Sequence, residues 1–302
     1  MGLTRCDGCA QSCPALAAAT PFILLMTPSI VVFTDFSAAA ERARSYAAAL
    51  AVCLKAQVHL LHVYPPAPEE ARVGPGTHAR DVSENRRLLV QVAADMLGST
   101  TATTVEADWD EAVSEIIRLH QPLLLVAGLT ATDGPPNEWS STRILPLAYQ
   151  TGYPLLLVPE HLPNAALRPP HCLALAVRDK SFRLAPKATV VAGLLDALRM
   201  VAVPVTVFPP EEATSGEQGL RSAQECGLTA TLYRSSLHRV IGNQPARGIL
   251  QAVHELSADM LTLLDPGHGW VYNLFNDNTI EQVLRHARVP VLLLSAEVSI
   301  LN

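Results

Sequence analysis

Gly152-Tyr-Pro-Leu-Leu-Leu-Val-Pro-Glu160 decides the fold, because a similar stretch, Arg288-Val-Pro-Val-Leu-Leu-Leu-Ser-Ala-Glu297, stands near the end of the chain. Another matching pair precedes these two: Gln121-Pro-Leu-Leu-Leu-Val-Ala127 and Ala258-Asp-Met-Leu-Thr-Leu-Leu264. Short runs of apolar residues are typical of strands buried on both faces of a parallel sheet. Two copies of one unit are therefore the simplest interpretation of the sequence.

Apolar runs alternate with helical periods throughout both copies. In the first copy we expect strands at residues 30–34, 57–64, 101–106, 122–127 and 153–158, and helices at 38–54, 83–97, 110–119 and 143–150. In the second copy we expect strands at 172–177, 204–208, 229–233, 259–264 and 289–294, and helices at 187–201, 218–225, 245–256 and 279–286. Ser37 and Asp110 are well placed as helix N-caps. This order predicts an α/β protein with two tandem, doubly wound, five-stranded parallel sheets.

Residues 161–170 are expected to link the two copies, since four prolines lie between Pro159 and Pro170. The first domain then covers residues 26–160 and the second 171–302. Residues 1–25 read differently, because Met26 leads directly into the first strand. We expect a disordered extension there. A signal peptide is the alternative, although Arg5 is the one basic residue there and no clear A-x-A cleavage site precedes the strand.

The composition argues against several classes of protein. Apolar residues make up 49% of the chain and charged residues 17%, which favours a folded chain over a disordered one. The net charge is −6 and no basic block occurs, so a nucleic-acid partner is not expected. No run of 18 or more apolar residues occurs, so we expect no membrane partner either.

The cysteines are Cys6, Cys9, Cys13, Cys53, Cys172 and Cys226. The first three have no fourth ligand at a suitable spacing, so we expect no metal site. The last three are scattered among apolar residues, as buried free thiols of a reducing compartment would be. We therefore expect a cytoplasmic location.

Several stretches, in order, resemble the universal stress protein family. Val31-Val-Phe-Thr-Asp35-Phe-Ser37, followed by an Ala-rich helix, resembles the opening of these proteins, and Val58-His-Leu-Leu-His-Val63 resembles their second strand. Asp259-Met-Leu-Thr-Leu-Leu264 and Val289-Pro-Val-Leu-Leu-Leu294 resemble their fourth and fifth strands. The resemblance covers residues 30–297 in two copies and implies a Rossmann-like fold of the universal stress protein type.

This resemblance implies a degenerate nucleotide-binding loop in the first copy. In ATP-binding members of the family, the fourth strand runs into G-x2-G-x9-G-[S/T]. Here Gly128, Ala131, Ser141 and Thr142 fill the four positions, so two of the three glycines are replaced. A Cβ at residue 131 would hinder the close approach of a phosphate to backbone N–H groups.

By the same resemblance, Asp35 and the backbone of Val63 would face the adenosine part of ATP. These residues would lie near the point where the strand order reverses, which is where ligands bind in such sheets. Arg143 adds positive charge near the phosphate positions, whereas Asp133 adds negative charge. The structural alternative is that Asp35 caps the first helix and residues 140–142 cap the fourth.

The second copy departs further from the ligand-binding pattern. Counting back from Thr279 places Asp265, His268 and Asn278 at the three glycine positions. Asp179 is a loose counterpart of Asp35. We therefore expect no nucleotide site in the second copy, which would serve as a structural partner of the first.

We expect a regulatory or stress-response protein that binds at most an adenine nucleotide and does not turn it over. One alternative is an ATP-hydrolysing or adenylyl-transferring enzyme on the same fold, and another is an interaction scaffold without a ligand. No catalytic residue is assigned. The resemblance also implies an intramolecular pseudo-dimer, in which the last strands of the two domains meet near Val158 and Leu294. A further homodimer of the whole chain is compatible with this arrangement.

Overall fold

The computed structural model describes residues 27–64, 77–96, 99–130, 143–211, 215–265 and 279–298. The expectations for residues 1–25 and their cysteines, for Ala131, Ser141 and Thr142, and for His268 and Asn278 fall outside the described residues.

Each repeat contains five strands of one sheet in the expected chain order. The first repeat comprises β1 (Ser29–Phe33), α1 (Ala38–Leu54), β2 (Gln57–Tyr64), α2 (Thr77–Ala94), β3 (Thr100–Glu106), α3 (Trp109–His120), β4 (Leu124–Leu129), α4 (Leu147–Thr151) and β5 (Leu155–Pro159). The 3₁₀ turn η3 (Asn164–Ala166) lies between the repeats. The second repeat comprises β6 (Cys172–Ala176), β7 (Phe182–Leu184), η4 (Ala188–Val191), α5 (Ala192–Ala197), β8 (Val201–Phe208), α6 (Glu217–Glu225), η5 (Ala230–Arg234), β9 (His238–Ile241), α7 (Pro245–Glu255), β10 (Met260–Asp265), α8 (Thr279–His286) and β11 (Val291–Val298).

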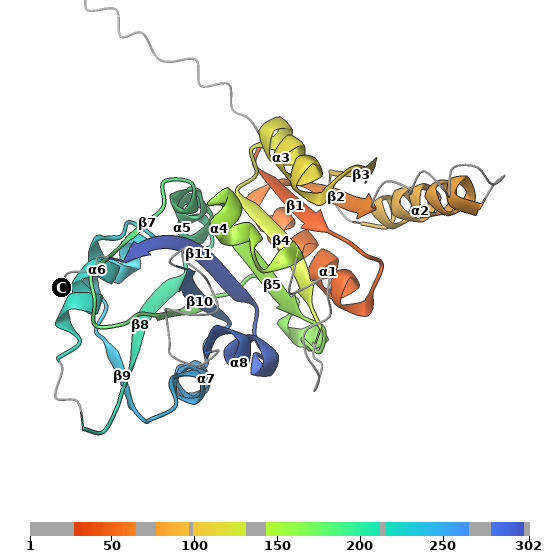
Figure 1. Ribbon diagram of the computed structural model, residues 1–302. Helices are drawn as coiled ribbons and strands as arrows, with labels where there is room; N and C mark the ends of the chain where they lie inside the picture. The colour runs from red at the N-terminus through yellow and green to blue at the C-terminus, as the bar shows by residue number, and fades with distance from the viewer. Residues whose placement is uncertain are drawn as a thin grey trace, which may run out of the picture.

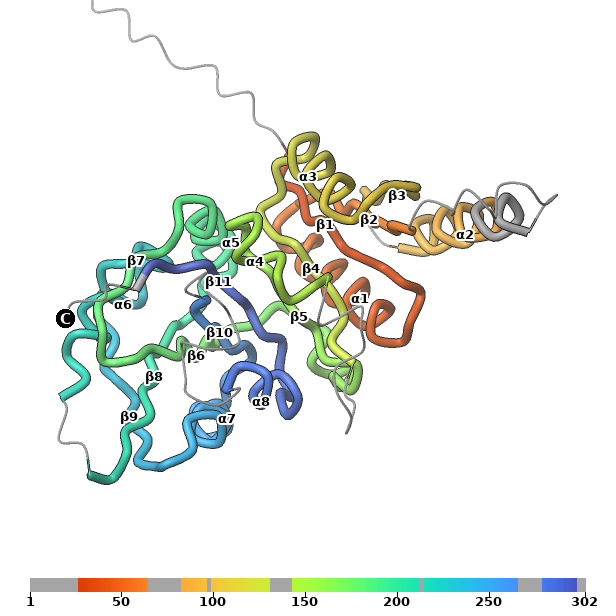
Figure 2. Tube along the Cα trace, viewed as in Figure 1, coloured from red at the N-terminus to blue at the C-terminus, as the bar shows by residue number. Residues whose placement is uncertain are grey.

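The strands of both repeats form one continuous sheet. Its order is β3-β2-β1-β4-β5-β11-β10-β6-β8-β9, with β7 paired to β11 outside this path. Within each repeat all pairs along the path are parallel, which confirms the expected doubly wound α/β fold. The two repeats lie on opposite sides of the β5–β11 pair (Figure 1), and the second repeat continues the sheet through β10, β6 and β8 to β9 (Figure 2).

Helices cover both faces of this sheet in the same way in the two repeats. One face buries side chains of α1, α2, α5 and α6 in a single aliphatic cluster. The opposite face buries side chains of α3, α4, α7 and α8. Both cores are aliphatic because the central strands are almost entirely Leu, Val, Ile and Ala. Burial of these side chains is the main favourable contribution to folding.

The repeats join through the antiparallel pair of β5 and β11. Leu156 lies opposite Leu292, and Leu155 lies opposite Leu293. All four of these leucines are at most 1% exposed. The pair contains the Val158 and Leu294 strands that the sequence placed near a pseudo-two-fold axis.

The linker also packs on both repeats. Leu162 is buried, and Arg42 of α1 donates to the side-chain oxygen of Asn164 at 2.6 Å. Arg168 forms an ion pair of 3.2 Å with Asp259, whose carboxylate also accepts from the backbone N–H of Cys172. Residues 161–170 therefore connect the repeats through defined contacts.

The expected strand at residues 229–233 is wrong. These residues form the 3₁₀ turn η5, and the third strand of the repeat is β9, which the sequence analysis missed. Asp196 accepts hydrogen bonds from the Thr229 hydroxyl and the Ala230 N–H, while the Thr231 hydroxyl accepts from Ala202 N–H. Threonine side chains thus take hydrogen bonds that a strand ladder would make, a competition typical of this residue type.

Other boundaries also differ from the expectations: α2 begins at Thr77 rather than Ser83, and β11 extends to Val298 rather than Leu294. The segment 187–201 is not one helix: η4 and α5 end at Ala197, and β8 already begins at Val201. The fourth helix begins at Leu147 rather than Arg143, directly after Pro146. The N-cap position of α3 is Asp108 rather than Asp110.

Candidate functional site

The candidate site of the first repeat lies where β1 and β4 end side by side. Asp35 follows β1 after one residue, and its Oδ1 accepts a hydrogen bond of 3.0 Å from the backbone N–H of Ser37. The hydroxyl of Ser37 in turn accepts from Ala40 N–H and caps α1. Asp35 therefore shapes the turn before the helix, and Ser37, as expected, is the N-cap.

Gly128 lies at the other wall of this site, next to the first turn of α1. A Cβ added at Gly128 would lie 2.3 Å from the carbonyl carbon of Ala39 and 2.6 Å from the nitrogen of Ala40. Only glycine permits so close an approach of strand and helix backbones. The start of α1, where backbone N–H groups favour anions, is thereby held against the end of β4.

Val63 is buried near the end of β2. The β1–β2 ladder ends with the bond from Thr34 N–H to the carbonyl of Leu61. Beyond it, Nδ1 of His62 donates to the carbonyl oxygen of Thr34 at 2.7 Å, and the His62 ring lies 4.6 Å from that of Phe36. The backbone of Val63 thus lies just past the end of β1, on the same edge of the sheet as Asp35.

Two further side chains lie at this edge of the sheet. Trp109 was not predicted as part of the site, and Arg143 was predicted only as a nearby positive charge. Trp109, at the start of α3, packs against Phe33 with ring centroids 5.2 Å apart and ring planes tilted by 45°. The guanidinium of Arg143 lies 6.0 Å from the centre of the Trp109 ring, a cation–π arrangement. The positive charge of Arg143 is therefore held at the carboxyl edge of the sheet. Trp109 could have been found as the first large residue after the third expected strand.

The second repeat differs at the corresponding positions. Val158 pairs with Gly128 in β4, and its counterpart Leu294 pairs with Leu264 in β10. The first glycine position is thus filled by Leu264, and the assignment of Asp265 to it was one residue out of register.

Asp179 has a different role from that of Asp35. Its carboxylate accepts hydrogen bonds from the backbone N–H groups of Gly216, Gln218 and Gly219 at 3.0–3.4 Å, at the start of α6. A carboxylate in this position satisfies orphan N–H groups of a helix start. Asp179 is therefore occupied by an internal contact of its own repeat.

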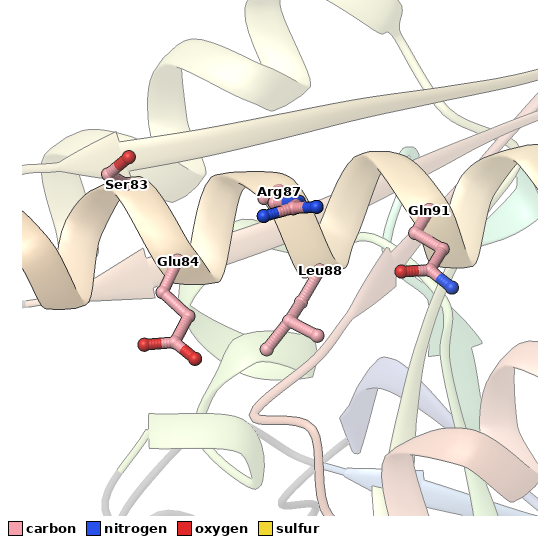
Figure 3. A pocket seen from close by; sticks show the side chains of 5 residues that line it. All are labelled: Ser83, Glu84, Arg87, Leu88 and Gln91. Atoms are coloured by element: carbon pink, nitrogen blue, oxygen red, sulfur yellow. The ribbon is translucent and has the colours of Figure 1, made fainter.

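Other features of the described residues point to no second site. No group of three metal-ligating side chains occurs among them, and none of their helices is long and apolar enough to cross a membrane. Burial raises the pKa of the Cys172 and Cys226 thiols, which disfavours reactive thiolates. A shallow hollow of about 470 Å³ is lined, as far as the described residues go, by Ser83, Glu84, Arg87, Leu88 and Gln91, all on α2 (Figure 3).

The comparisons with known proteins agree with this fold. Residues 26–135 and 183–295 match the model of the universal stress protein family. An α/β protein with two such repeats in one sheet is the class that the structure defines, and the chain belongs to the universal stress protein family.

Solved structures show the same architecture at low identity. A universal stress protein from Archaeoglobus fulgidus DSM 4304 has a TM-score of 0.61 and 16% identity, covering 88% of this chain and 98% of that one. A putative universal stress protein from Pseudomonas aeruginosa UCBPP-PA14 has a TM-score of 0.50 and 15% identity, covering 90% of this chain and 94% of that one. At such identity the likeness concerns the fold alone. A search of curated proteins found no match.

Proposed function

We propose that this universal stress protein is a regulatory protein that binds one adenine nucleotide in its first repeat and does not turn it over. The observation that carries the proposal is the difference between the two carboxyl edges. In the first repeat, Gly128 keeps the start of α1 beside β4, and the half-buried Asp35 makes a single hydrogen bond among the described residues. In the second repeat, Leu264 and the helix cap of Asp179 take these places.

The residues present fit the two ends of a nucleotide differently. Asp35 can accept hydrogen bonds from ribose hydroxyls, and the Val63 backbone can bond to the edge of a base. The first turn of α1 and the cation of Arg143 suit a phosphate. The loss of two loop glycines, at Ala131 and Ser141, leaves fewer close backbone contacts for a triphosphate, so we expect weak binding.

The regulatory role and the cytoplasmic location are parts of the same proposal. The thiols of Cys53, Cys172 and Cys226 are free, as a reducing compartment would allow, although Cys53 is exposed and the other two are half-buried rather than buried as expected. Binding without turnover would let a cell read nucleotide levels through the shape or contacts of the protein.

Calorimetric titration with ATP, ADP and AMP, with and without Mg²⁺, tests the proposal. We expect one site per chain, at least tenfold weaker in Asp35→Ala and unchanged in Glu225→Ala, which removes an exposed acid from α6. No heat at millimolar nucleotide would overturn nucleotide binding. Release of inorganic phosphate in a parallel assay would instead support the enzyme alternative.

A further inference from the structure

The two outer edges of the sheet are built differently. At one end, β9 has four residues and carries the exposed Arg239. Beside it, η5 covers the start of β8, because the Thr231 hydroxyl accepts from Ala202 N–H at 3.1 Å. Short strands, edge charges and covering turns are common means of preventing strand addition.

At the other end, β3 is longer, carries its single charge at its last residue, Glu106, and has no covering turn among the described residues. It runs for seven residues, Thr-Thr-Ala-Thr-Thr-Val-Glu, and pairs with β2 along its whole length. Five of the seven residues are Thr or Val, which favour strands, and Lys, Arg, Pro and Gly are absent from it. Within the described part of the chain, no strand pairs with its outer side (Figure 1).

The register shows which backbone groups face outward. Val58 N–H donates to the carbonyl of Ser99, so residues 99, 101, 103 and 105 bond to β2. Alternate residues of a strand direct their N–H and C=O to opposite sides. Thr100, Ala102 and Thr104 therefore point theirs away from the sheet.

Helix α2 packs on a face of β3 rather than on this edge. Ala102 joins the same apolar cluster as Val92 and Ala93 of α2. On the opposite face, the side chains of Thr101 and Thr103 are exposed. A strand from outside could therefore reach the edge and that face together.

We propose that β3 is a dimerisation edge, where a second copy of this chain adds its own β3 antiparallel about a two-fold axis at Thr103. In this register Ala102 lies opposite Thr104 of the second copy, and Thr100 lies opposite Glu106. Outward-facing groups thus meet outward-facing groups along the full strand, and no like charges face each other. The result is one sheet running through both chains.

A second copy fits better than an unrelated peptide for two reasons. The edge is self-complementary about its central residue, which is the requirement of a two-fold interface. The chain also already joins its own repeats by antiparallel pairing of two strand edges, at β5 and β11. The dimer does not depend on nucleotide binding.

Sedimentation equilibrium over a wide range of protein concentration tests the proposal. We expect the mass of the parent chain to rise toward that of a dimer, and Thr103→Lys to stay a monomer, because two lysines would meet at the axis. The control Ala230→Lys adds the same charge at an exposed position of η5 and should dimerise like the parent. A parent that remains monomeric throughout, or a dimer unaffected by Thr103→Lys, overturns the proposal.

Oxidative cross-linking tests the register without disturbing the strand. Thr103 bonds to β2, so two copies of it form a non-hydrogen-bonded pair about 4.5 Å apart at Cα, a distance that a disulfide can span. Thr103→Cys should give covalent dimers above the background of the parent, whereas Thr101→Cys should not. Equal cross-linking of the two variants, or none in either, contradicts the proposed pairing.

Discussion

The two repeats share a sheet and the placement of their helices, yet they differ where β1 meets β4 and where β6 meets β10. In the first repeat Gly128 lets α1 start directly after the turn of Asp35 and Ser37. In the second repeat Leu264 fills the matching position, and the chain forms β7 before its first helical turn at Ala188. The comparison shows that the loss of one glycine accompanies the rebuilding of a whole crossover.

β7 shows what the rebuilt crossover does instead. It pairs with residues 296–298 of β11, beyond the stretch at 291–293 that pairs with β5. Ala185 N–H also donates to the carbonyl of Ser295. The segment that leads straight to α1 in the first repeat thus supports the joint of the two repeats in the second.

The joint itself should give the largest effect. The double variant Leu156→Asp with Leu293→Asp places two carboxylates at fully buried positions of β5 and β11, so we expect a loss of about 5 kcal/mol or more in the free energy of unfolding. Urea denaturation and soluble yield measure this. Leu119→Asp, at an exposed position in the last turn of α3, should cost no more than about 1 kcal/mol. A double variant as stable as the parent would mean that the repeats do not join through these strands.

Gly128 should tolerate no side chain. Gly128→Ala would force β4 and α1 apart, and we expect a loss of about 3 kcal/mol. Gly193→Ala, in α5, has open space around its Cβ and should leave stability unchanged or slightly raised. Thermal and urea unfolding of both variants would show the contrast, and equal effects would refute the close approach.

A buried histidine should make the first repeat sensitive to mild acid. His59 stacks on His120 and hydrogen-bonds to the Thr101 hydroxyl, and burial, with His120 as a lesser cause, lowers the pKa of His59 to about 4. The register places Val203 at the matching position of β8. Because the folded pKa lies below the unfolded value of about 6.5, the stabilisation is complete above pH 6.5 and is lost as pH falls toward 4.

We therefore expect His59→Val, which places the residue of the second repeat at this position, to reduce the loss of stability as pH falls. The parent should lose roughly 2–3 kcal/mol between pH 7 and pH 4.5, and the variant should lose clearly less. Urea denaturation at the two pH values measures this difference. His161→Val removes an exposed histidine and should behave as the parent does. Parallel pH profiles for parent and His59→Val would contradict the account.

The two aspartates should give the smallest and most direct contrast. Asp179→Ala removes the partner of three backbone N–H groups, and we expect a loss of about 2 kcal/mol. Asp35→Ala removes the partner of one backbone N–H group, so we expect a loss of less than about 1 kcal/mol in the free energy of unfolding. Chemical denaturation under the same conditions compares them. The reverse order would show that Asp35 is the more structural of the two.

The strands of the central sheet could be predicted from sequence, because short all-apolar runs such as 124–129 and 291–294 are typical of strands buried on both faces. The helix α1 was predicted to the residue, since Ser37 caps it and alanines fill it. The prediction of the third strand of the second repeat was wrong. Thr229 and Thr231 make polar contacts with Asp196 and Ala202, which are far away in sequence.

The site was harder to predict than the fold. Asp35, Val63 and Gly128 were predicted from the resemblance to the family, and the structure brings them to one edge of the sheet, where ligand binding stays a prediction. The counterpart of Gly128 in the second repeat was predicted as Asp265, whereas the structure shows Leu264 there. Counting along a chain does not reveal the register of paired strands. The three N–H partners of Asp179 likewise depend on a helix that starts nearly 40 residues later.

Hydrogen exchange with and without ATP tests most directly whether only the first repeat keeps a ligand site. We predict slower exchange at residues 34–41 and 61–64, where Asp35, the start of α1 and the Val63 backbone lie. We predict no change at residues 177–181 and 216–220 of the second repeat, which the Asp179 cap already holds. Protection in the second repeat, or equal protection in both, would contradict the inequality of the two repeats.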